Sequence, residues 1–193
     1  MHRDDIIFAA AQIFRKKGYD ATSMQDIADA VGLQKASLYH HVQSKQEILL
    51  VILDHALDLM IDDLQAVLAS SGDPEDKIRR AVRATIGRLT EDSDLAGVLL
   101  LEHRSLEPKL RSKHVARRDR YDALWRQLVQ SGIDAGALRP VDVQLASFAL
   151  LGVQNWMITW YREGGRLSVD QIADTFADLF LNGLRVDHQG AAA

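Results

Sequence analysis

Helical periodicity runs through almost all of this 193-residue chain and limits what it can fold into. Apolar residues recur at intervals of three and four, and no stretch alternates with the two-residue period of a half-buried strand. Only three prolines occur, Pro74, Pro108 and Pro140, and each lies where a helix is expected to begin. We therefore predict an all-α protein of about nine helices.

The expected helices divide the chain near residue 45. Three short helices, at about residues 3–17, 23–32 and 35–41, form a compact head with a glycine-initiated turn between the second and the third. A long helix capped by Ser44 leads into a larger body. Its further helices are expected at about residues 74–89, 95–103, 108–131, 141–162 and 168–183. We predict two domains, 1–45 and 46–187.

The composition excludes several kinds of site. No cysteine is present, so disulfides, thiolate metal sites and cysteine nucleophiles are excluded. The net charge of −4 argues against a protein that coats nucleic acid through bulk charge, although it permits a locally placed basic surface. The first residues include two acids and no small-residue cleavage site, and polar residues interrupt the apolar stretch 145–161. We expect a cytoplasmic protein with no membrane partner.

The third helix of the head exposes an unusual mixture of side chains. Leu38 faces the other two helices, and Val42 joins it one turn later. The residues left outside are one long cation, one methyl group, one hydroxyl, one phenol and one imidazole: Lys35, Ala36, Ser37, Tyr39 and His40. This set suits base edges and phosphates better than burial, and two short helices joined by a tight turn form a helix-turn-helix.

The segment "GYDATSMQDIADAVGLQKASLYHHVQSKQEIL", residues 18–49, resembles the DNA-binding signature of the TetR family of bacterial transcriptional regulators. The matching positions are Gly18, Tyr19, Thr22, Ser23, Ile27, Ala28, Gly32, Leu38, Tyr39, His41, Ser44 and Lys45. Two positions depart from the commonest pattern, since His40 stands where an aromatic residue is usual and Val42 where phenylalanine is usual.

The resemblance implies a homodimer that binds a palindromic double-stranded DNA operator, with one recognition helix in each half-site. The positions that would face bases are Gln25, Gln34, Lys35, Ala36 and Ser37. Those that would face phosphates are Ser23, Tyr39, His40 and Lys45. Residues 1–45 are then the helix-turn-helix DNA-binding domain. The alternative is a helix-turn-helix that serves only as a packing unit. The exposed polar side chains of the third helix argue against this alternative.

We find no credible catalytic or metal-binding constellation. The adjacent side chains of His40 and His41 diverge by about 100° on a helix and do not readily bind one metal. Neither an HExxH nor a G-x-S-x-G pattern occurs. We predict that the protein is not an enzyme and uses no cofactor or metal. A helical metal-binding or enzymatic protein is the alternative of another class.

The two last helices of the body carry a candidate dimer interface. The helix near residues 141–162 is apolar nearly all round, so it needs neighbours on every side. A second copy of the chain would cover one face in a four-helix interface. The predicted dimerisation residues are Val153, Trp160, Phe176, Phe180 and Leu184. The alternative is an ordinary monomer core.

The remaining apolar surface of the body predicts an effector cavity, although the same residues could be plain core. The candidates are Ile86, Leu101, Tyr121, Trp125, Leu128, Phe148, Gly152, Asn155, Trp156 and Thr159. The helix after Pro108 carries six basic residues, which form either a solvated face or an anion site for a ligand with phosphates: Lys109, Arg111, Lys113, Arg117, Arg118 and Arg120.

The C-terminal pattern "NWMITWYREGGRLSVDQIADTFADLFLNGL" is similar to TetR regulators of fatty acid, phenylacetate and sterol catabolism, whose effectors are acyl-CoA thioesters. This resemblance implies a ligand-responsive repressor released by an apolar effector of the acyl-CoA class. The alternative is a multidrug or lipophile-sensing repressor of an efflux gene.

Overall fold

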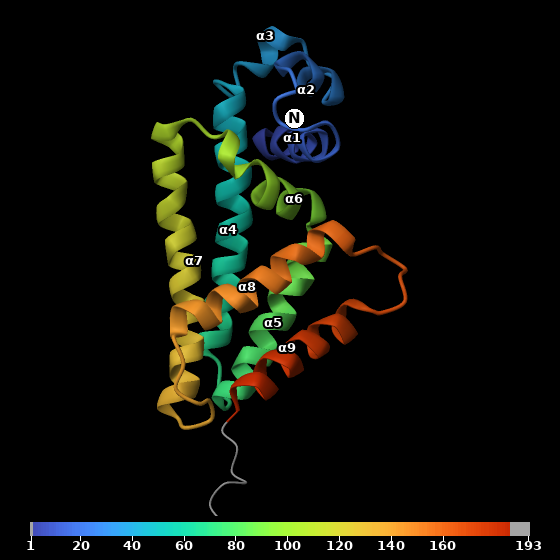
Figure 1. The fold of residues 1–193 in the computed structure, drawn as a ribbon. Coiled ribbons are helices and arrows are strands. Elements are labelled where there is room, and N and C mark those ends of the chain that lie inside the picture. Colours follow the sequence, from blue (N-terminus) through green and yellow to red (C-terminus); the bar gives the residue numbers. More distant parts are fainter. Residues whose placement is uncertain (1, 186–193) are drawn as a thin grey trace, which may run out of the picture. The chain divides into compact units, whose positions relative to one another are not determined.

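The computed structural model describes residues 2–185, and this part of the chain consists of helices joined by loops (Figure 1). The elements are α1 (Arg3–Lys17), α2 (Met24–Ala30), α3 (Lys35–Leu38), α4 (Lys45–Ala69), α5 (Pro74–Glu91), α6 (Ser93–Glu102), the 3-10 turn η1 (His103–Ser105), α7 (Pro108–Asp134), α8 (Val143–Trp160) and α9 (Val169–Leu184). The predicted all-α class is confirmed for the described residues.

The helices form two compact units. The first comprises Met1–Leu59 and Asp92–Asp119, and the second comprises Met60–Glu91 and Arg120–Ala193. The long helices α4 and α7 contribute residues to both units. The division at residue 45 concerns function rather than packing and stays a prediction. Its end at residue 187 lies outside the described residues.

In the first unit α1 packs across α6, and α2 and α3 follow it (Figure 1). Ile6, Ala10 and Phe14 recur every four residues on α1, and all three are buried. Arg15 crosses the backbone of α6 at Gly97, where an added Cβ would collide with the Arg15 side chain. Because no larger residue fits without displacing Arg15, Gly97 permits this close approach.

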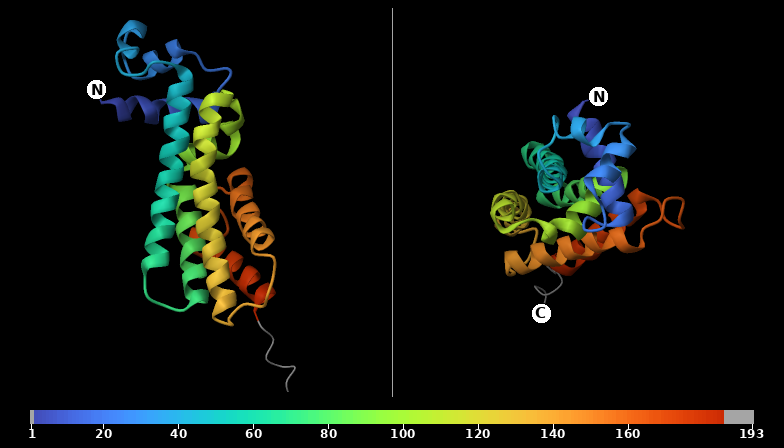
Figure 2. Two further views of the ribbon diagram at one scale, coloured as in Figure 1. Left: turned by 90° about the vertical axis from the view of Figure 1, so that its left-hand side faces the viewer. Right: turned by 90° about the horizontal axis from the view of Figure 1, so that it is seen from above.

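The first half of α7 runs beside the first half of α4 (Figure 2). His114 on α7 is buried, and its Nδ1 lies 3.1 Å from the Asp54 Oδ1. Arg117 donates to the other oxygen of Asp54 at 2.8 Å and to Asp58 at 3.0 Å. The Nε2 of His114 has no hydrogen-bond partner among the described residues. Asp54 is therefore the single carboxylate that satisfies this buried imidazole.

The second unit is built around α5 and α9, which lie side by side (Figure 1). Ion pairs join the two helices, from Arg79 to Asp178 at 2.6 Å and from Arg83 to Asp174 at 2.5 Å. The loop after α7 reaches the end of α9, where the Arg139 N–H donates to the Leu184 carbonyl at 2.8 Å. These contacts fix α9 on α5.

We expect Asp54→Ala to destabilise the fold by about 1–3 kcal/mol, because it leaves a buried imidazole unpaired. Urea unfolding followed by circular dichroism measures the effect. Asp58→Ala is the matched control, since it removes a half-exposed partner of the same arginine and is expected to cost about 0–1 kcal/mol. Equal losses in the two variants would show that the His114 contact adds nothing.

Candidate nucleic-acid interface and effector body

The chain turns sharply before α2, and local hydrogen bonds hold that turn. Gly18 has φ +84°, a conformation that side-chain-bearing residues rarely adopt. The Thr22 hydroxyl donates to the Gly18 carbonyl at 2.7 Å. Ser23 then caps α2, since its Oγ accepts the Asp26 N–H at 3.1 Å while Asp26 accepts the Ser23 N–H at 2.7 Å. The first turn of α2 is thus fixed by its own sequence.

The Asp26 carboxylate is the electrostatic centre of this capping box. Hydrogen bonds from Ser23 are the main reason that the pKa of Asp26 lies well below its usual range. The Lys17 Nζ, which donates to Asp26 at 2.9 Å, lowers this pKa further. A carboxylate that stays ionised keeps accepting the Ser23 N–H at every physiological pH. Ser23 therefore presents a constant geometry at the start of α2.

The third helix is shorter than predicted. The sequence indicated a helix to about residue 41, whereas α3 ends at Leu38. The His40 and His41 N–H groups bond to carbonyls three residues back, at 3.2 and 3.0 Å, so the chain tightens into a turn. Leu38 and Val42 are buried, as predicted. His41, which matches the family signature, is exposed.

Most residues predicted to read DNA are accessible on the first unit. Gln34, Lys35, Ala36, Tyr39 and His40 are exposed, and Ser37 is partly buried. They come from one short stretch, so they lie close together around α3. Their assignment to bases or phosphates stays a prediction.

Three other predicted DNA contacts are already engaged within the chain. Gln25 donates to Asp29 at 2.7 Å, and Ser23 takes part in the capping box. The Lys45 Nζ donates to the carbonyls of Tyr19 and Thr22 at 2.8 and 2.7 Å. These groups bind a phosphate or base only by adding to or replacing those bonds.

The predicted effector residues fall into two sets. Ile86, Tyr121, Trp125 and Leu128 are buried in the second unit, and Asn155 is partly buried. The others are exposed: Leu101 in the first unit, and Phe148, Gly152, Trp156 and Thr159 on α8. Trp156 is 66% exposed. The structure does not bring the ten residues together around one surface, and their role stays a prediction.

A buried polar group lies among the first set. The hydroxyls of Thr85 and Tyr121 lie 3.3 Å apart, and burial raises the pKa of Tyr121 to about 12. The indole N–H of Trp125 slightly offsets this rise in the Tyr121 pKa, but its geometry does not meet that of a hydrogen bond. The Oε1 of Gln154 also has no partner among the described residues. Thr85 could not be found from the sequence, because a lone threonine on an apolar stripe carries no signal.

The predicted dimerisation residues also differ in exposure. Val153 and Trp160 are exposed on α8, Phe176 and Phe180 on α9 are partly buried, and Leu184 is buried. The rings of Trp160 and Phe176 meet edge to face with centroids 6.4 Å apart. The exposed members therefore share the outer face of α8 with Phe148 and Trp156.

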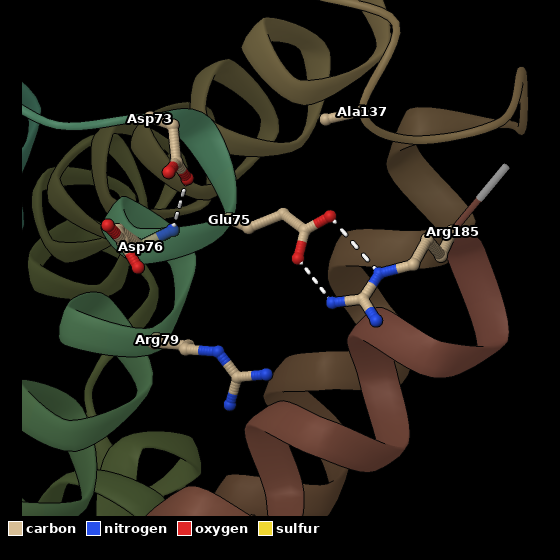
Figure 3. Close-up of a pocket in the computed structure, with 6 residues that line it drawn as sticks. All are labelled: Asp73, Glu75, Asp76, Arg79, Ala137 and Arg185. Carbon is tan, nitrogen blue, oxygen red and sulfur yellow. Dashed lines mark hydrogen bonds and ion pairs between the residues drawn. The ribbon is translucent and has the colours of Figure 1, made fainter.

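A pocket of about 370 Å³ lies at the N-terminal end of α5 (Figure 3). Its lining is Asp73, Glu75, Asp76, Arg79, Ala137 and Arg185, and none of these was a predicted effector residue. Glu75 accepts two hydrogen bonds from Arg185, the shorter at 2.5 Å, and Arg79 pairs with Asp178. Because the charged groups bind one another, this pocket does not suit an apolar ligand.

The basic residues at the start of α7 are only partly free. Arg111 donates to the carbonyls of Arg104 and Leu106, and Arg117 pairs with two aspartates. Lys109, Lys113, Arg118 and Arg120 are exposed. Within residues 2–185 no group of histidines and carboxylates could hold a metal ion. Nor does any described helix combine the length and apolarity needed to cross a membrane.

Two family models match the chain, and together they cover both ends of the fold. "Bacterial regulatory proteins, tetR family" matches residues 6–52, and "Tetracyclin repressor-like, C-terminal domain" matches residues 71–184. A helix-turn-helix followed by a helical body is the architecture of a DNA-binding regulator. The protein belongs to the tetR family of bacterial regulatory proteins. Members of this family are transcriptional regulators and not enzymes, which confirms that prediction.

Individual relatives span nearly the whole chain. The HTH-type transcriptional repressor KstR2 of Rhodococcus jostii (strain RHA1) is 29% identical over 189 residues, which cover 96% of this chain and 92% of that protein. The TetR family regulator PfmR from Thermus thermophilus is 39% identical, with a TM-score of 0.86 and coverage of 94% and 99% of the two chains. AibR, solved with isovaleryl coenzyme A and operator DNA, is 31% identical, with a TM-score of 0.86 and coverage of 93% and 97%.

We expect Lys35→Ala to relax base preference, with a loss of about 1–3 kcal/mol of discrimination at the contacted base pair. Selection of duplexes from a random-sequence library measures the preference. Lys16→Ala removes the same charge from an exposed site on α1 and is expected to leave the selected sequence unchanged. An identical preference in wild type and Lys35→Ala would rule out a base contact for this lysine.

Proposed function

We propose that the protein is a homodimeric repressor that binds a palindromic operator and is released by a small effector with an apolar acyl chain, of the acyl-CoA class. The observation that carries the operator binding and the effector class is the similarity, over nearly the full chain, to AibR, whose solved complex holds isovaleryl coenzyme A together with operator DNA. The repressor KstR2 adds support, because it matches across both the head and the body. A regulator of this kind acts on chromosomal DNA in the bacterial cytoplasm.

The outer face of α8 supports the dimer. Leu145, Phe148, Val153, Trp156 and Trp160 recur with helical spacing, and all five are exposed large apolar side chains. Contiguous apolar surface of this kind marks an interaction site on a folded protein. A second copy related by two-fold symmetry would bury it and would match the symmetry of a palindrome.

The buried polar atoms of the second unit support an effector site. An unpaired buried N–H or carbonyl oxygen is costly, so it normally has a partner. The Trp125 Nε1 is a donor and the Gln154 Oε1 an acceptor, and both lack one among the described residues. The Tyr121 hydroxyl stays protonated below a pKa of about 12, and it offers a second donor when it accepts from the Thr85 hydroxyl 3.3 Å away. An acyl thioester offers an apolar chain together with a carbonyl acceptor.

Val153→Arg should convert the dimer into a monomer, because it places a charge on the apolar α8 face. Size-exclusion chromatography with light scattering measures the mass in solution. Gln127→Arg adds the same charge to an exposed position on α7 and should leave the mass unchanged. A wild-type monomer, or a dimer that tolerates Val153→Arg, would contradict this interface.

Acyl-CoA thioesters should release the protein from the selected duplex, whereas free coenzyme A and the matching free fatty acids should not. Fluorescence anisotropy of labelled DNA follows release during the titration. Trp125→Phe removes the unpaired N–H and keeps an aromatic ring, so it should weaken the response about five- to tenfold with little change in DNA affinity. Release by unrelated apolar drugs, with no response to any thioester, would favour a multidrug sensor.

A further inference from the structure

The loop between α1 and α2 is held by a lysine from α4. The Lys45 Nζ donates to the Tyr19 carbonyl at 2.8 Å and to the Thr22 carbonyl at 2.7 Å, and it lies 4.2 Å from the centroid of the Tyr19 ring. A lysine ammonium has three N–H donors and no acceptor. The Lys45 Nζ also lies 3.5 Å from the Asp20 carbonyl, so three carbonyls and one aromatic ring of the same loop surround the ammonium.

The Glu102 carboxylate of α6 also holds the loop between α1 and α2, by binding the main-chain N–H of Tyr19. The Tyr19 N–H donates to the Glu102 Oε1 at 3.3 Å. Nearby, Gln46 donates to the Ser105 carbonyl at 2.8 Å and accepts the Glu107 N–H at 2.9 Å, which fastens the start of α4 to the segment after α6. Both main-chain groups of Tyr19 are thus bound by side chains from distant helices.

This loop leads directly into the candidate phosphate-contacting group. Thr22 precedes Ser23, the N-cap of α2, and is itself buried. If Lys45 turned to bind a phosphate, the Thr22 carbonyl would lose its donor close to the buried side of the loop, and the Tyr19 carbonyl would keep only the Thr22 N–H at 3.1 Å. An unpaired carbonyl there costs free energy, which opposes that rearrangement.

We propose that Lys45 and Glu102 are positioning residues for operator binding, which fix the loop that presents Ser23 to DNA, and that Lys45 does not contact a phosphate. The proposal rests on the proposed phosphate role of Ser23. Lys45 is positively charged and Glu102 negatively charged, and both would fix the loop that precedes Ser23. Loss of either should weaken DNA binding, although their charges act on DNA in opposite directions.

The salt dependence of DNA binding tests the role of Lys45. The probe is a duplex that the wild-type protein selects from a random library, and its affinity is measured over a series of salt concentrations. Lys45→Met should lower affinity about tenfold and leave the slope of log K against log salt unchanged. If Lys45 instead neutralised a phosphate directly, its removal would reduce the magnitude of that slope by about 0.9. A reduced slope or an unchanged affinity overturns the proposal.

Glu102 gives a second test, in which charge and positioning predict opposite signs. Glu102→Ala removes a negative charge, which alone would strengthen binding, whereas loss of positioning weakens it several-fold. Glu102→Gln retains an acceptor for the Tyr19 N–H and should restore most of the affinity. Glu107→Ala removes an equal charge from an exposed side chain of the same segment and should not weaken binding. Stronger binding by Glu102→Ala overturns the proposal.

Thermal unfolding of each variant confirms that the protein tested is folded. The design also separates this proposal from the proposed function. A wild-type protein that selects no duplex refutes operator binding, whereas a wild-type protein that selects one, with variants that fail the slope or sign test, refutes only the positioning roles.

Discussion

The position of the residues predicted to contact DNA around α3, Gln34–His40, depends on the burial of Leu38 and Val42. A helix of four residues cannot hold itself together, because helix nucleation is unfavourable until more bonds have formed. Both side chains are almost completely inaccessible, and burial of one such side chain stabilises by about 1.5–3 kcal/mol. The tight turn after α3 ends at the same anchor, since the Val42 N–H bonds to the Leu38 carbonyl at 3.1 Å. Apolar contact, rather than helix propensity, therefore sets where Lys35 and its exposed neighbours lie.

Local chemistry was readable from the sequence, and contacts between distant segments were not. The helices expected at about residues 3–17, 23–32 and 168–183 follow from residues within one or two turns, and α1, α2 and α9 lie there. The engagement of Lys45 was missed because its partners lie more than twenty residues away. The contact between Tyr19 and Glu102 spans 83 residues, and no periodicity encodes such a pair.

Contacts between distant segments also decide which residues of α8 share a face, and for this reason the sequence predicted some of them for the effector cavity and others for the dimer interface. An apolar pattern all round a helix says that each face needs a neighbour, but it does not say which face meets which neighbour. In the structure Leu150, Gln154 and Met157 turn inward, whereas Phe148 and Trp156 share the outward face with Val153 and Trp160. The sequence had assigned Phe148 and Trp156 to the effector, and the structure groups them with the residues predicted for dimerisation.

The ion pairs between α5 and α9 have an electrostatic consequence for assembly. Asp170, Asp174 and Asp178 stand one turn apart on α9 and would by themselves make a negative stripe on this helix. Two such stripes repel one another, and they also repel DNA. Arg79 and Arg83 sit against these carboxylates, so the stripe is largely neutralised within one chain. The flank formed by α9 therefore carries little net charge, and in the proposed dimer the apolar face of α8 would decide whether two copies associate.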